Sequence, residues 1–223
     1  MIFFKDYSSI FNKNIIAFST IKNHQIPSET VLSKSLKEYN IHKIASCNQV
    51  HSDNVLFVDC QGSYDNSDGL ITTIKSNVFL KIQTADCVPI YIYDFNKGLI
   101  GLIHSGWKGT YKEIIKNAIN IFFKKGSSYN DIQVFLGPSI RKCCYEIKDD
   151  VACFFDDKYL TLKHQKIYLN LQSKIIDDLL SMNIKVDNIK KTEDCTYHSN
   201  EFYSYRKEGN IGRIYSILGF MYE

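Results

Sequence analysis

The sequence is poor in tryptophan, proline and arginine. Its 223 residues include one Trp, three Pro and three Arg, whereas the other 24 basic residues are Lys. The tryptophan is Trp107, and the arginines are Arg141, Arg206 and Arg213. In a chain that prefers Lys so strongly, an arginine indicates either an ordinary surface position or a place where phosphate or carboxylate requires a planar, bidentate donor.

Long apolar runs and a strong net charge are also missing. No stretch approaches the roughly 20 apolar residues of a membrane helix, and the first residues do not show the pattern of a secretory signal. The formal net charge is +3 and the lysines are scattered, which is too mild for a nucleic-acid groove. The sequence therefore predicts a cytoplasmic protein, a monomer or small homo-oligomer, with no membrane or nucleic-acid partner.

The seven cysteines contain no CxxC pair, which argues against a zinc ribbon. In a reducing compartment such thiols are expected to be buried, catalytic or metal-binding, not disulfide-bonded. The phosphate-binding loop, the nucleophile elbow, the zinc deaminase signature and the H-E-x-x-H motif are all absent.

Apolar, β-rich runs alternate irregularly with amphipathic segments. Strands are predicted at 15–20, 55–59, 78–86, 88–94, 99–107 and 132–139. Helices are predicted at 28–39, from a capping box at Thr110 to Gly126, at 146–155, and at 171–180 behind an Asn170 cap. The stretch 202–220 reads as a hairpin. We expect an α/β (α+β) fold, a layered sandwich with mixed β-sheets flanked by helices, as a single domain over residues 1–223.

Three potential metal ligands lie at or near the ends of predicted strands. They are His51, Cys87 and His104, separated by 36 and 17 residues, so only the fold can bring them together. Two imidazoles and one thiolate suit Zn²⁺, and three protein ligands leave a fourth position for water or substrate. The competing interpretation is a turn histidine, a buried cysteine and a core histidine.

Other candidate site residues lie in the same segments. A glycine-rich turn follows His104 and leads into a predicted helix, where free N–H groups and Lys108 would attract an anion. Asp86 precedes Cys87 and is a candidate to orient a metal-bound histidine, or else a solvated carboxylate. Trp107 is a candidate to stack on a flat ligand or to pack in the core, and Arg206 to hold phosphate.

Six sequence blocks together resemble the YfiH-like family, also called the laccase-domain or multicopper polyphenol oxidase family and described as purine nucleoside phosphorylases. The blocks follow the family order within residues 45–220: QVHS (49–52), DGLIT (68–72), TADCVPI (84–90), HSGWKG (104–109), GPSIRKCCYEI (137–147) and FYSYRKEGNIGR (202–213). The resemblance implies an α/β domain with a zinc ion bound by His51, Cys87 and His104. It also implies phosphorolysis of adenosine, inosine and methylthioadenosine and deamination of adenosine, with a purine nucleoside and phosphate as partners.

The chain departs from the family pattern at several positions. Ser52 replaces a usual Gly, Lys108 a usual Arg and Ser139 a usual Cys, and Arg141 with Lys142 replaces Gly-Pro. The three ligand positions are intact. The changes bear instead on how phosphate and nucleoside are held, because Lys keeps the charge of Arg but loses its fork.

Three other functions remain open on the sequence alone. Cys87 and His104 are also suited to a metal-free thiolate–imidazole hydrolase. The older family name suggests a copper phenol oxidase, but the six histidines contain no His-x-His pair and no Met lies in a motif. A binding or peptidoglycan-editing protein that holds its ligand over the metal is the last alternative.

Overall fold

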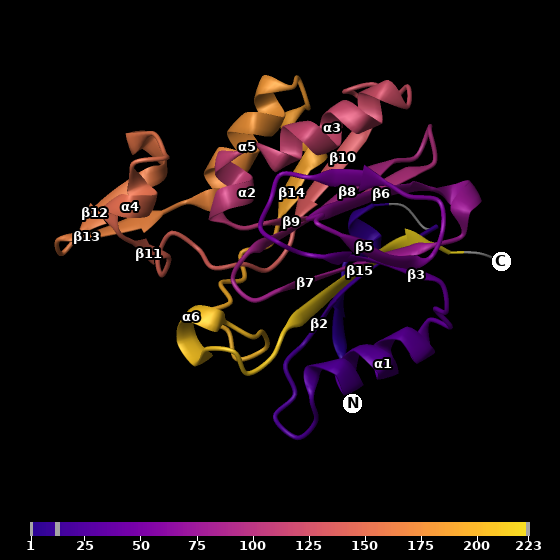
Figure 1. The fold of residues 1–223 in the computed structure, drawn as a ribbon, viewed down its shortest axis with the longest axis horizontal. Coiled ribbons are helices and arrows are strands. Elements are labelled where there is room, and N and C mark those ends of the chain that lie inside the picture. Colours follow the sequence, from indigo (N-terminus) through magenta and orange to yellow (C-terminus); the bar gives the residue numbers. More distant parts are fainter. Residues whose placement is uncertain (1, 12–13, 222–223) are drawn as a thin grey trace.

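Two six-stranded mixed β-sheets face each other, and helices cover both outer faces (Figure 1). The structure is a computed structural model that describes residues 2–11 and 14–221. It confirms the predicted fold class of layered, mixed sheets flanked by helices. Among the described residues, no helix has both the length and the apolar character that a membrane crossing requires.

The first sheet mixes antiparallel and parallel strands. Its spatial order is β1 (Phe4–Asp6), β2 (Ile15–Thr20), β15 (Ile214–Phe220), β7 (Phe79–Thr84), β3 (Ile44–Asn48) and β5 (Gly62–Asp65). The pairs β1–β2, β2–β15 and β15–β7 are antiparallel, whereas β3 runs parallel to both β7 and β5.

The second sheet is antiparallel at its centre and parallel at its edges. Its order is β14 (Ile189–Lys191), β10 (Ile132–Leu136), β8 (Val88–Asp94), β9 (Leu99–Ser105), β6 (Gly69–Thr73) and β4 (Val55–Phe57). A small antiparallel sheet projects beside it, with the order β11 (Glu146–Ile147), β13 (Lys166–Leu169) and β12 (Leu160–Lys163).

The helices are short. They are α1 (Ser28–Glu38), α2 (Trp107–Tyr111), α3 (Ile114–Lys124), α4 (Asp149–Ala152), α5 (Leu171–Ser181) and α6 (Tyr205–Glu208), with 3₁₀ turns η1 (Ser8–Ile10), η2 (Ile74–Ser76), η3 (Asp157–Tyr159) and η4 (Val186–Asn188). In Figure 1, α3 and α5 lie over the second sheet and α1 lies beneath the first.

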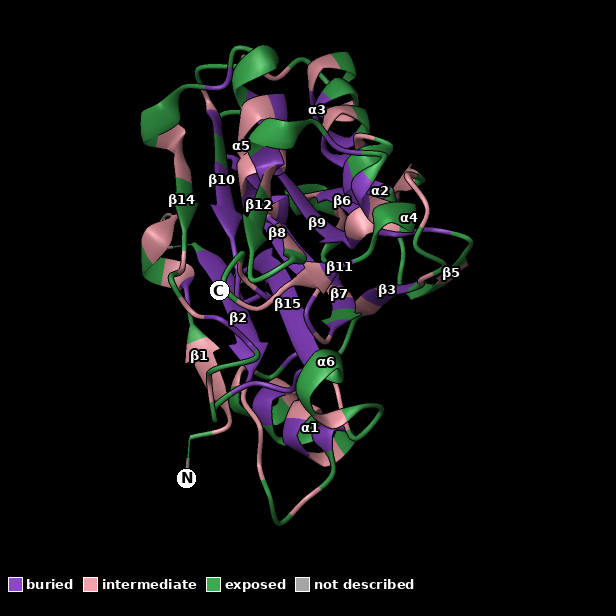
Figure 2. Ribbon diagram, turned by 90° about the vertical axis from the view of Figure 1, so that its left-hand side faces the viewer, coloured by how far each residue is buried: buried purple, intermediate pink, exposed green. Residues whose placement is uncertain are grey.

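Alternation along the strands builds a separate core on each face. In β8, Ile90 and Ile92 pack in the cluster that includes α3 and α5, whereas Tyr91 and Tyr93 pack between the two sheets. In β2, Ile16 belongs to the cluster under α1. Strands β2, β8, β9 and β15 are buried along their whole length (Figure 2), which accounts for their largely apolar sequences.

The long predicted helix from Thr110 to Gly126 is two helices. Helix α2 begins at Trp107, and Glu113 then adopts a left-handed conformation with φ of 60° before α3 starts. Thr110 is not the cap, because its hydroxyl is buried against the hydroxyl of Ser105 at 2.8 Å. The end of the helix near Gly126 and the Asn170 cap of α5 are as predicted.

Two predicted elements are wrong because their strands pair with residues that are distant in the sequence. The predicted helix 146–155 is the two-residue strand β11 followed by the single turn α4, since residues 146–147 pair with β13. The predicted hairpin at 202–220 is the turn α6, capped by the Ser204 side chain, followed by β15. Strand β15 pairs with β2 and β7, which are distant in the sequence.

Candidate active site and metal centre

The fold brings His51, Cys87 and His104 together at one end of the sandwich. Their ligand atoms all lie within 4.8 Å of one another. His51 follows β3, Cys87 lies in the turn between β7 and β8, and His104 lies near the end of β9. Because β7 and β8 belong to different sheets, that turn carries the thiol across the junction between them.

A buried carboxylate, Asp68, organises the two histidines. Its Oδ1 accepts a hydrogen bond from His104 Nδ1 at 2.8 Å and from the main-chain N–H of His51 at 3.0 Å. Its Oδ2 accepts from the main-chain N–H groups of Val50 and Ser52. These bonds hold His51 in a left-handed conformation, with φ of 58°. They also direct Nδ1 of His104 away from Cys87, so that Nε2 remains for a ligand.

The three donors perturb one another's protonation. Burial alone would raise the pKa of Cys87, but His104 and His51 outweigh it and lower the pKa to about 6. Burial would lower the pKa of His104, but Cys87 and Asp68 raise it to about 9. Hydrogen bonds from His104 and Ser52 overcome the burial of Asp68 and lower its pKa to about 2. The cluster therefore favours a thiolate, the form that binds metal ions.

The donor set and its surroundings fit Zn²⁺. Gly106 leaves no room for a side chain, because a Cβ there would lie 2.9 Å from Cys87 Sγ and 3.1 Å from His51 Cδ2. This close approach keeps the thiol and the exposed imidazole converging. Two imidazoles and a thiolate leave one position of a tetrahedral ion free for water or substrate.

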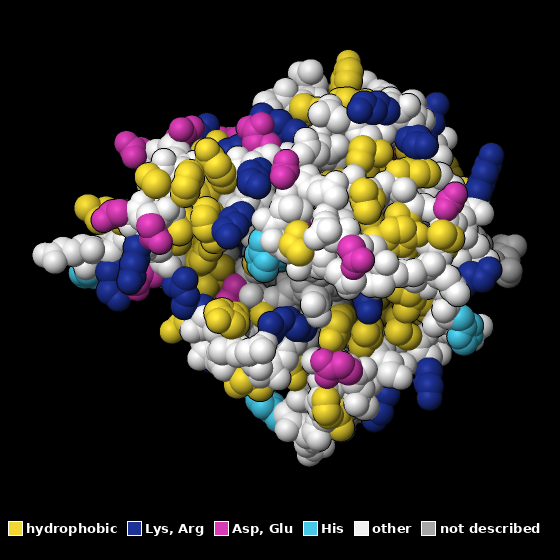
Figure 3. All heavy atoms as spheres, viewed as in Figure 1, with side chains coloured by type: hydrophobic (Ala, Val, Ile, Leu, Met, Phe, Trp, Pro, Cys, Tyr) yellow, Lys and Arg dark blue, Asp and Glu magenta, His cyan; other side chains and the backbone are white. Residues whose placement is uncertain are grey.

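The three donors open onto a cavity of about 550 Å³. Figure 3 shows a hollow near the middle of this side of the molecule, with histidine and Lys or Arg side chains around it. Besides the metal-ligand candidates, the cavity walls contain Trp107, Tyr145, Tyr205, Arg206 and Arg213. Aromatic residues and two arginines therefore line the same space as Cys87, a volume suited to a small ligand.

Asp86 lies in the cavity wall but has another role than the predicted orientation of a histidine. Its Oδ1 accepts from Thr196 Oγ1 at 2.6 Å and its Oδ2 from the main-chain N–H of Arg206 at 2.7 Å. The carboxylate that orients His104 is Asp68. Asp86 instead ties the loop around Thr196 and the start of α6 to the turn that carries Cys87.

The other predicted site residues divide into two groups. Trp107 and Arg206 line the cavity, and Arg206 also donates to the carbonyl of Glu146 at 2.6 Å. The Trp107 ring stacks on Phe154, with centroids 5.8 Å apart. Lys108 is exposed with its Nζ 5.6 Å from the Trp107 ring centre, and the structure does not place it among the lining residues.

The departures from the family pattern have local partners. The Ser52 hydroxyl donates to Asp68 at 2.8 Å, so it adds to the support of the histidine loop. Ser139 is buried and accepts from Gln172 Nε2 at 2.8 Å. Arg141 donates to the carbonyl of Thr192 and to the Glu193 carboxylate, so it binds the 192–195 loop and lies outside the cavity lining.

Sequence reasoning missed several residues of this site, among them Asp68, Tyr145 and Tyr205. Asp68 stands in the block DGLIT without any spacing that marks it as a partner of His104. The Tyr145 ring centre lies 5.5 Å from Cζ of Arg206, and no spacing in the sequence marks these two residues as neighbours either. What identifies Asp68 is its burial and its bonds to both histidine segments, and these exist only in the folded chain.

The family model described as "Multi-copper polyphenol oxidoreductase laccase" matches residues 27–221. A protein of Clostridium acetobutylicum named purine nucleoside phosphorylase is 35% identical over 83% of this chain and 80% of its own length. A protein from an unknown prokaryotic organism named adenosine deaminase RL5 is 27% identical over 70% of this chain and 63% of its own length. The solved structure of YfiH from Bacillus licheniformis superposes with a TM-score of 0.85 at 27% identity, covering 92% of both chains.

Proposed function

Because the chain belongs to the multi-copper polyphenol oxidoreductase laccase family, in which relatives are named purine nucleoside phosphorylase and adenosine deaminase, we propose that it is a purine nucleoside enzyme. The observation that carries the proposal is the composition of the cavity, whose lining combines Cys87 and two histidines with aromatic residues and arginines. A nucleoside and a phosphate ion require these two kinds of partner.

The aromatic residues of the cavity would receive the base. Trp107 and Tyr145 line the cavity, and stacking on a flat ring is the interaction that a purine face offers. Phe154 supports Trp107 from behind, with their planes 27° apart. A ring held in this way keeps its orientation when no ligand is bound.

Arg206 and Arg213 would hold the phosphate. Both arginines line the cavity, and the Arg206 guanidinium is fixed by its bond to Glu146 and by the Tyr145 ring. In phosphorolysis a phosphate oxygen forms a bond to the anomeric sugar carbon while the glycosidic bond breaks, and the bond electrons leave with the base. Paired guanidinium groups would orient the nucleophile for this in-line approach.

We propose His51, Cys87 and His104 as the residues that hold Zn²⁺ in this enzyme. When bound, the ion would supply a Lewis acid at this corner of the cavity. Asp68 would fix the His104 ring so that Nε2 faces the ion, and Gly106 would allow the thiolate and His51 to approach it.

One other function has a specific observation in its favour. The lowered pKa of Cys87, about 6, next to His104 also suits a metal-free nucleophilic hydrolase. Metal content separates the two, because a nucleophilic thiolate must remain free of tightly bound metal.

The test is the purified chain incubated with adenosine and inorganic phosphate. We expect adenine with ribose 1-phosphate from phosphorolysis, or inosine from deamination, and a loss of either product after chelation that added zinc restores. Protein that retains its metal but forms none of these products from adenosine, inosine or methylthioadenosine would contradict the proposal.

A further inference from the structure

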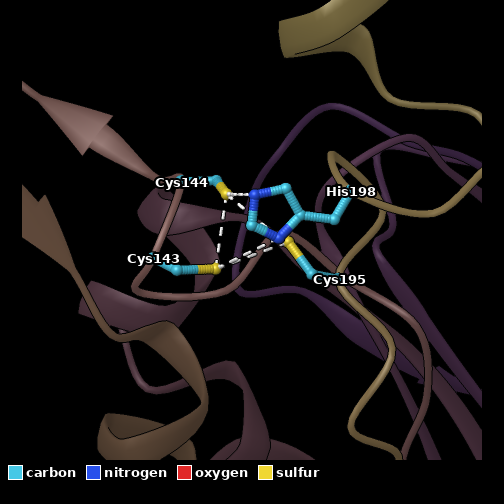
Figure 4. Close-up of side chains that lie close together, drawn as sticks. All are labelled: Cys143, Cys144, Cys195 and His198. Atoms are coloured by element: carbon cyan, nitrogen blue, oxygen red, sulfur yellow. Dashed lines mark hydrogen bonds between the residues drawn. The ribbon is translucent and has the colours of Figure 1, made fainter.

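We propose that the chain has a second metal site, a closed tetrahedral zinc site formed by Cys143, Cys144, Cys195 and His198. The four side chains converge from two loops, as Figure 4 shows, and their potential ligand atoms all lie within 4.8 Å of one another. Three thiols and one imidazole are the donor set of structural zinc sites. This inference does not depend on the proposed activity.

The distances between the donors match those around one ion. Two sulfurs bound to tetrahedral Zn²⁺ at about 2.3 Å lie about 3.8 Å apart, and a sulfur and a nitrogen lie slightly closer. Sγ of Cys143 is 3.3 Å from Sγ of Cys144 and 3.8 Å from Sγ of Cys195. Nδ1 of His198 is 3.8 Å from Cys144 Sγ and 3.9 Å from Cys143 Sγ. An ion would therefore need only small side-chain adjustments.

Main-chain bonds hold the two loops in place. The first loop follows β10 and turns tightly, because the N–H groups of Cys144 and Tyr145 both donate to the carbonyl of Arg141. In the second loop, the carbonyl of Cys195 accepts from the N–H groups of His198 and Ser199. This turn brings Cys195 and His198, which are three residues apart, onto the same side of the loop.

Contacts between the loops fix their spacing. Ser139 and Cys195 form a parallel bridge, and the N–H of Thr196 donates to the carbonyl of Ser139 at 3.1 Å. Arg141 donates from the first loop to the carbonyl of Thr192 and to Glu193. The cysteines are therefore held close by contacts other than their own, as a preformed metal site requires.

Burial of the donors also suits a bound cation. Cys195 is buried, Cys144 is half-buried, and Cys143 and His198 are exposed, so an ion can enter from solvent. Each thiol that binds the ion would release its proton to solvent.

A disulfide is the competing chemistry for such close thiols. A bond between Cys143 and Cys195 would need an oxidant and would use only two of the three sulfurs. It would leave Cys144 and the His198 ring without a reason to converge on the same point. The convergence of all four donors therefore favours a metal ion.

The second cluster adjoins the wall of the cavity described above. Cys144 is followed by Tyr145, which lines the cavity, and Cys195 is followed by Thr196, which donates to Asp86. An ion that joins the two loops would hold both of these contacts at once. The site would thus stabilise one wall of the cavity from outside.

The test begins with the zinc content of the full chain purified under reducing conditions. We expect about two zinc ions per chain, and about one for Cys195→Ser and for the exposed His198→Ala. Cys153→Ser, which alters an exposed cysteine outside both clusters, should keep the wild-type content. At most one ion in the wild type, unchanged in both cluster variants, would overturn the proposal.

Cobalt substitution distinguishes the two clusters. In Cys87→Ser protein the first cluster has no thiolate, so any thiolate-to-cobalt charge-transfer absorption must come from the second. We expect this absorption to persist in Cys87→Ser and to fall strongly when His198→Ala or Cys195→Ser is added. Its absence from folded, reduced Cys87→Ser protein would overturn the proposal.

Thiol titration completes the set. Chelated, denatured protein purified under reducing conditions should show all seven cysteines as free thiols. A count lower by two, with a Cys143–Cys195 or Cys143–Cys144 disulfide found by peptide mapping, would assign the cluster to redox chemistry and contradict the zinc site.

Discussion

Asp68 and His104 are joined twice. The carboxylate Oδ1 of Asp68 accepts from His104 Nδ1 at 2.8 Å, and its carbonyl oxygen accepts from the main-chain N–H of His104 at 2.7 Å. The ring and the strand that carries it are therefore fixed to the same buried residue. Through Oδ1 and Oδ2 that residue also holds the loop of His51.

The first prediction concerns Asp68→Asn. An amide of the same size would turn N–H donors toward the main-chain N–H groups of the His51 loop and would remove the negative charge that faces His104. We expect zinc affinity of the first cluster and nucleoside turnover to fall about 10- to 100-fold. Chelator competition and product formation measure the two effects. Asp59→Asn, at an exposed carboxylate, is the matched control, and equal losses in both variants would contradict the role of Asp68.

The second prediction concerns Gly106→Ala. The added Cβ would lie 2.9 Å from Cys87 Sγ and 3.1 Å from His51 Cδ2, so both side chains must move. We expect the affinity for zinc to fall at least about tenfold. The unfolding temperatures of the metal-free wild type and the metal-free variant should be nearly the same, so that the loss of affinity reflects the metal site and not the fold. Unchanged metal affinity would show that the two ligands do not converge at Gly106.

The third prediction concerns metal removal. A bound ion should shield Cys87 from alkylation, so chelation should increase modification of this residue by iodoacetamide and abolish turnover. Mass spectrometry of the Cys87 peptide, before and after chelation and zinc addition, measures the effect. Equal alkylation in all three samples, together with an active metal-free enzyme, would favour the Cys–His hydrolase instead.

The fourth prediction separates Arg213 from Lys108. Arg213 lines the cavity, and its Nη1 donates to the neighbouring carbonyl of Gly212, so its replacement breaks few contacts of the fold. We expect Arg213→Gln to lower kcat/KM for phosphate about tenfold to hundredfold, since hydrogen bonds to charged groups contribute about 1.5–3 kcal/mol. Lys108→Ala should change it less than about threefold. The reverse order would move the phosphate site to the turn after His104.

The fifth prediction concerns pH. Hydrogen bonds from Lys158 Nζ and Tyr159 Oη hold the pKa of Asp177 below its ordinary value. The ionised Asp177 carboxylate therefore stabilises the folded protein. Its contribution is complete above the ordinary carboxyl pKa of about 3.9 and is lost as the pH falls through the lower pKa of the folded state. We expect the free energy of unfolding to fall slightly less steeply with decreasing pH in Asp177→Asn than in the wild type, as measured by unfolding at a series of acid pH values. The exposed Asp187→Asn should leave the slope unchanged.

The sequence predicted elements whose identity depends on their own residues. Strand β2 was placed at its observed bounds because six consecutive residues are suited to a buried strand, and α5 was placed by its apolar face and the Asn170 cap. The two strands that flank Cys87 and the strand that carries His104 were also found, so the first cluster could be proposed before the fold was known. Local pattern was sufficient at these positions.

The sequence did not predict the structure where contacts between distant residues determine it. Residues 214–220 were assigned to a hairpin with their neighbours, but their partners are β2 and β7. The break at Glu113 depends on one left-handed residue that a helical pattern does not reveal. The four donors of the second cluster were missed because two loops, 52 residues apart between Cys143 and Cys195, meet only in the folded chain.

The central position of β15 has a consequence for how the protein is made. Strand β15 lies between β2 and β7, so neither can acquire this neighbour until residues 214–220 have left the ribosome. Until then the nascent chain would carry two unpaired strand edges, and such edges promote association between chains. Completion of the first sheet therefore requires one strand to insert between two that were synthesised long before it.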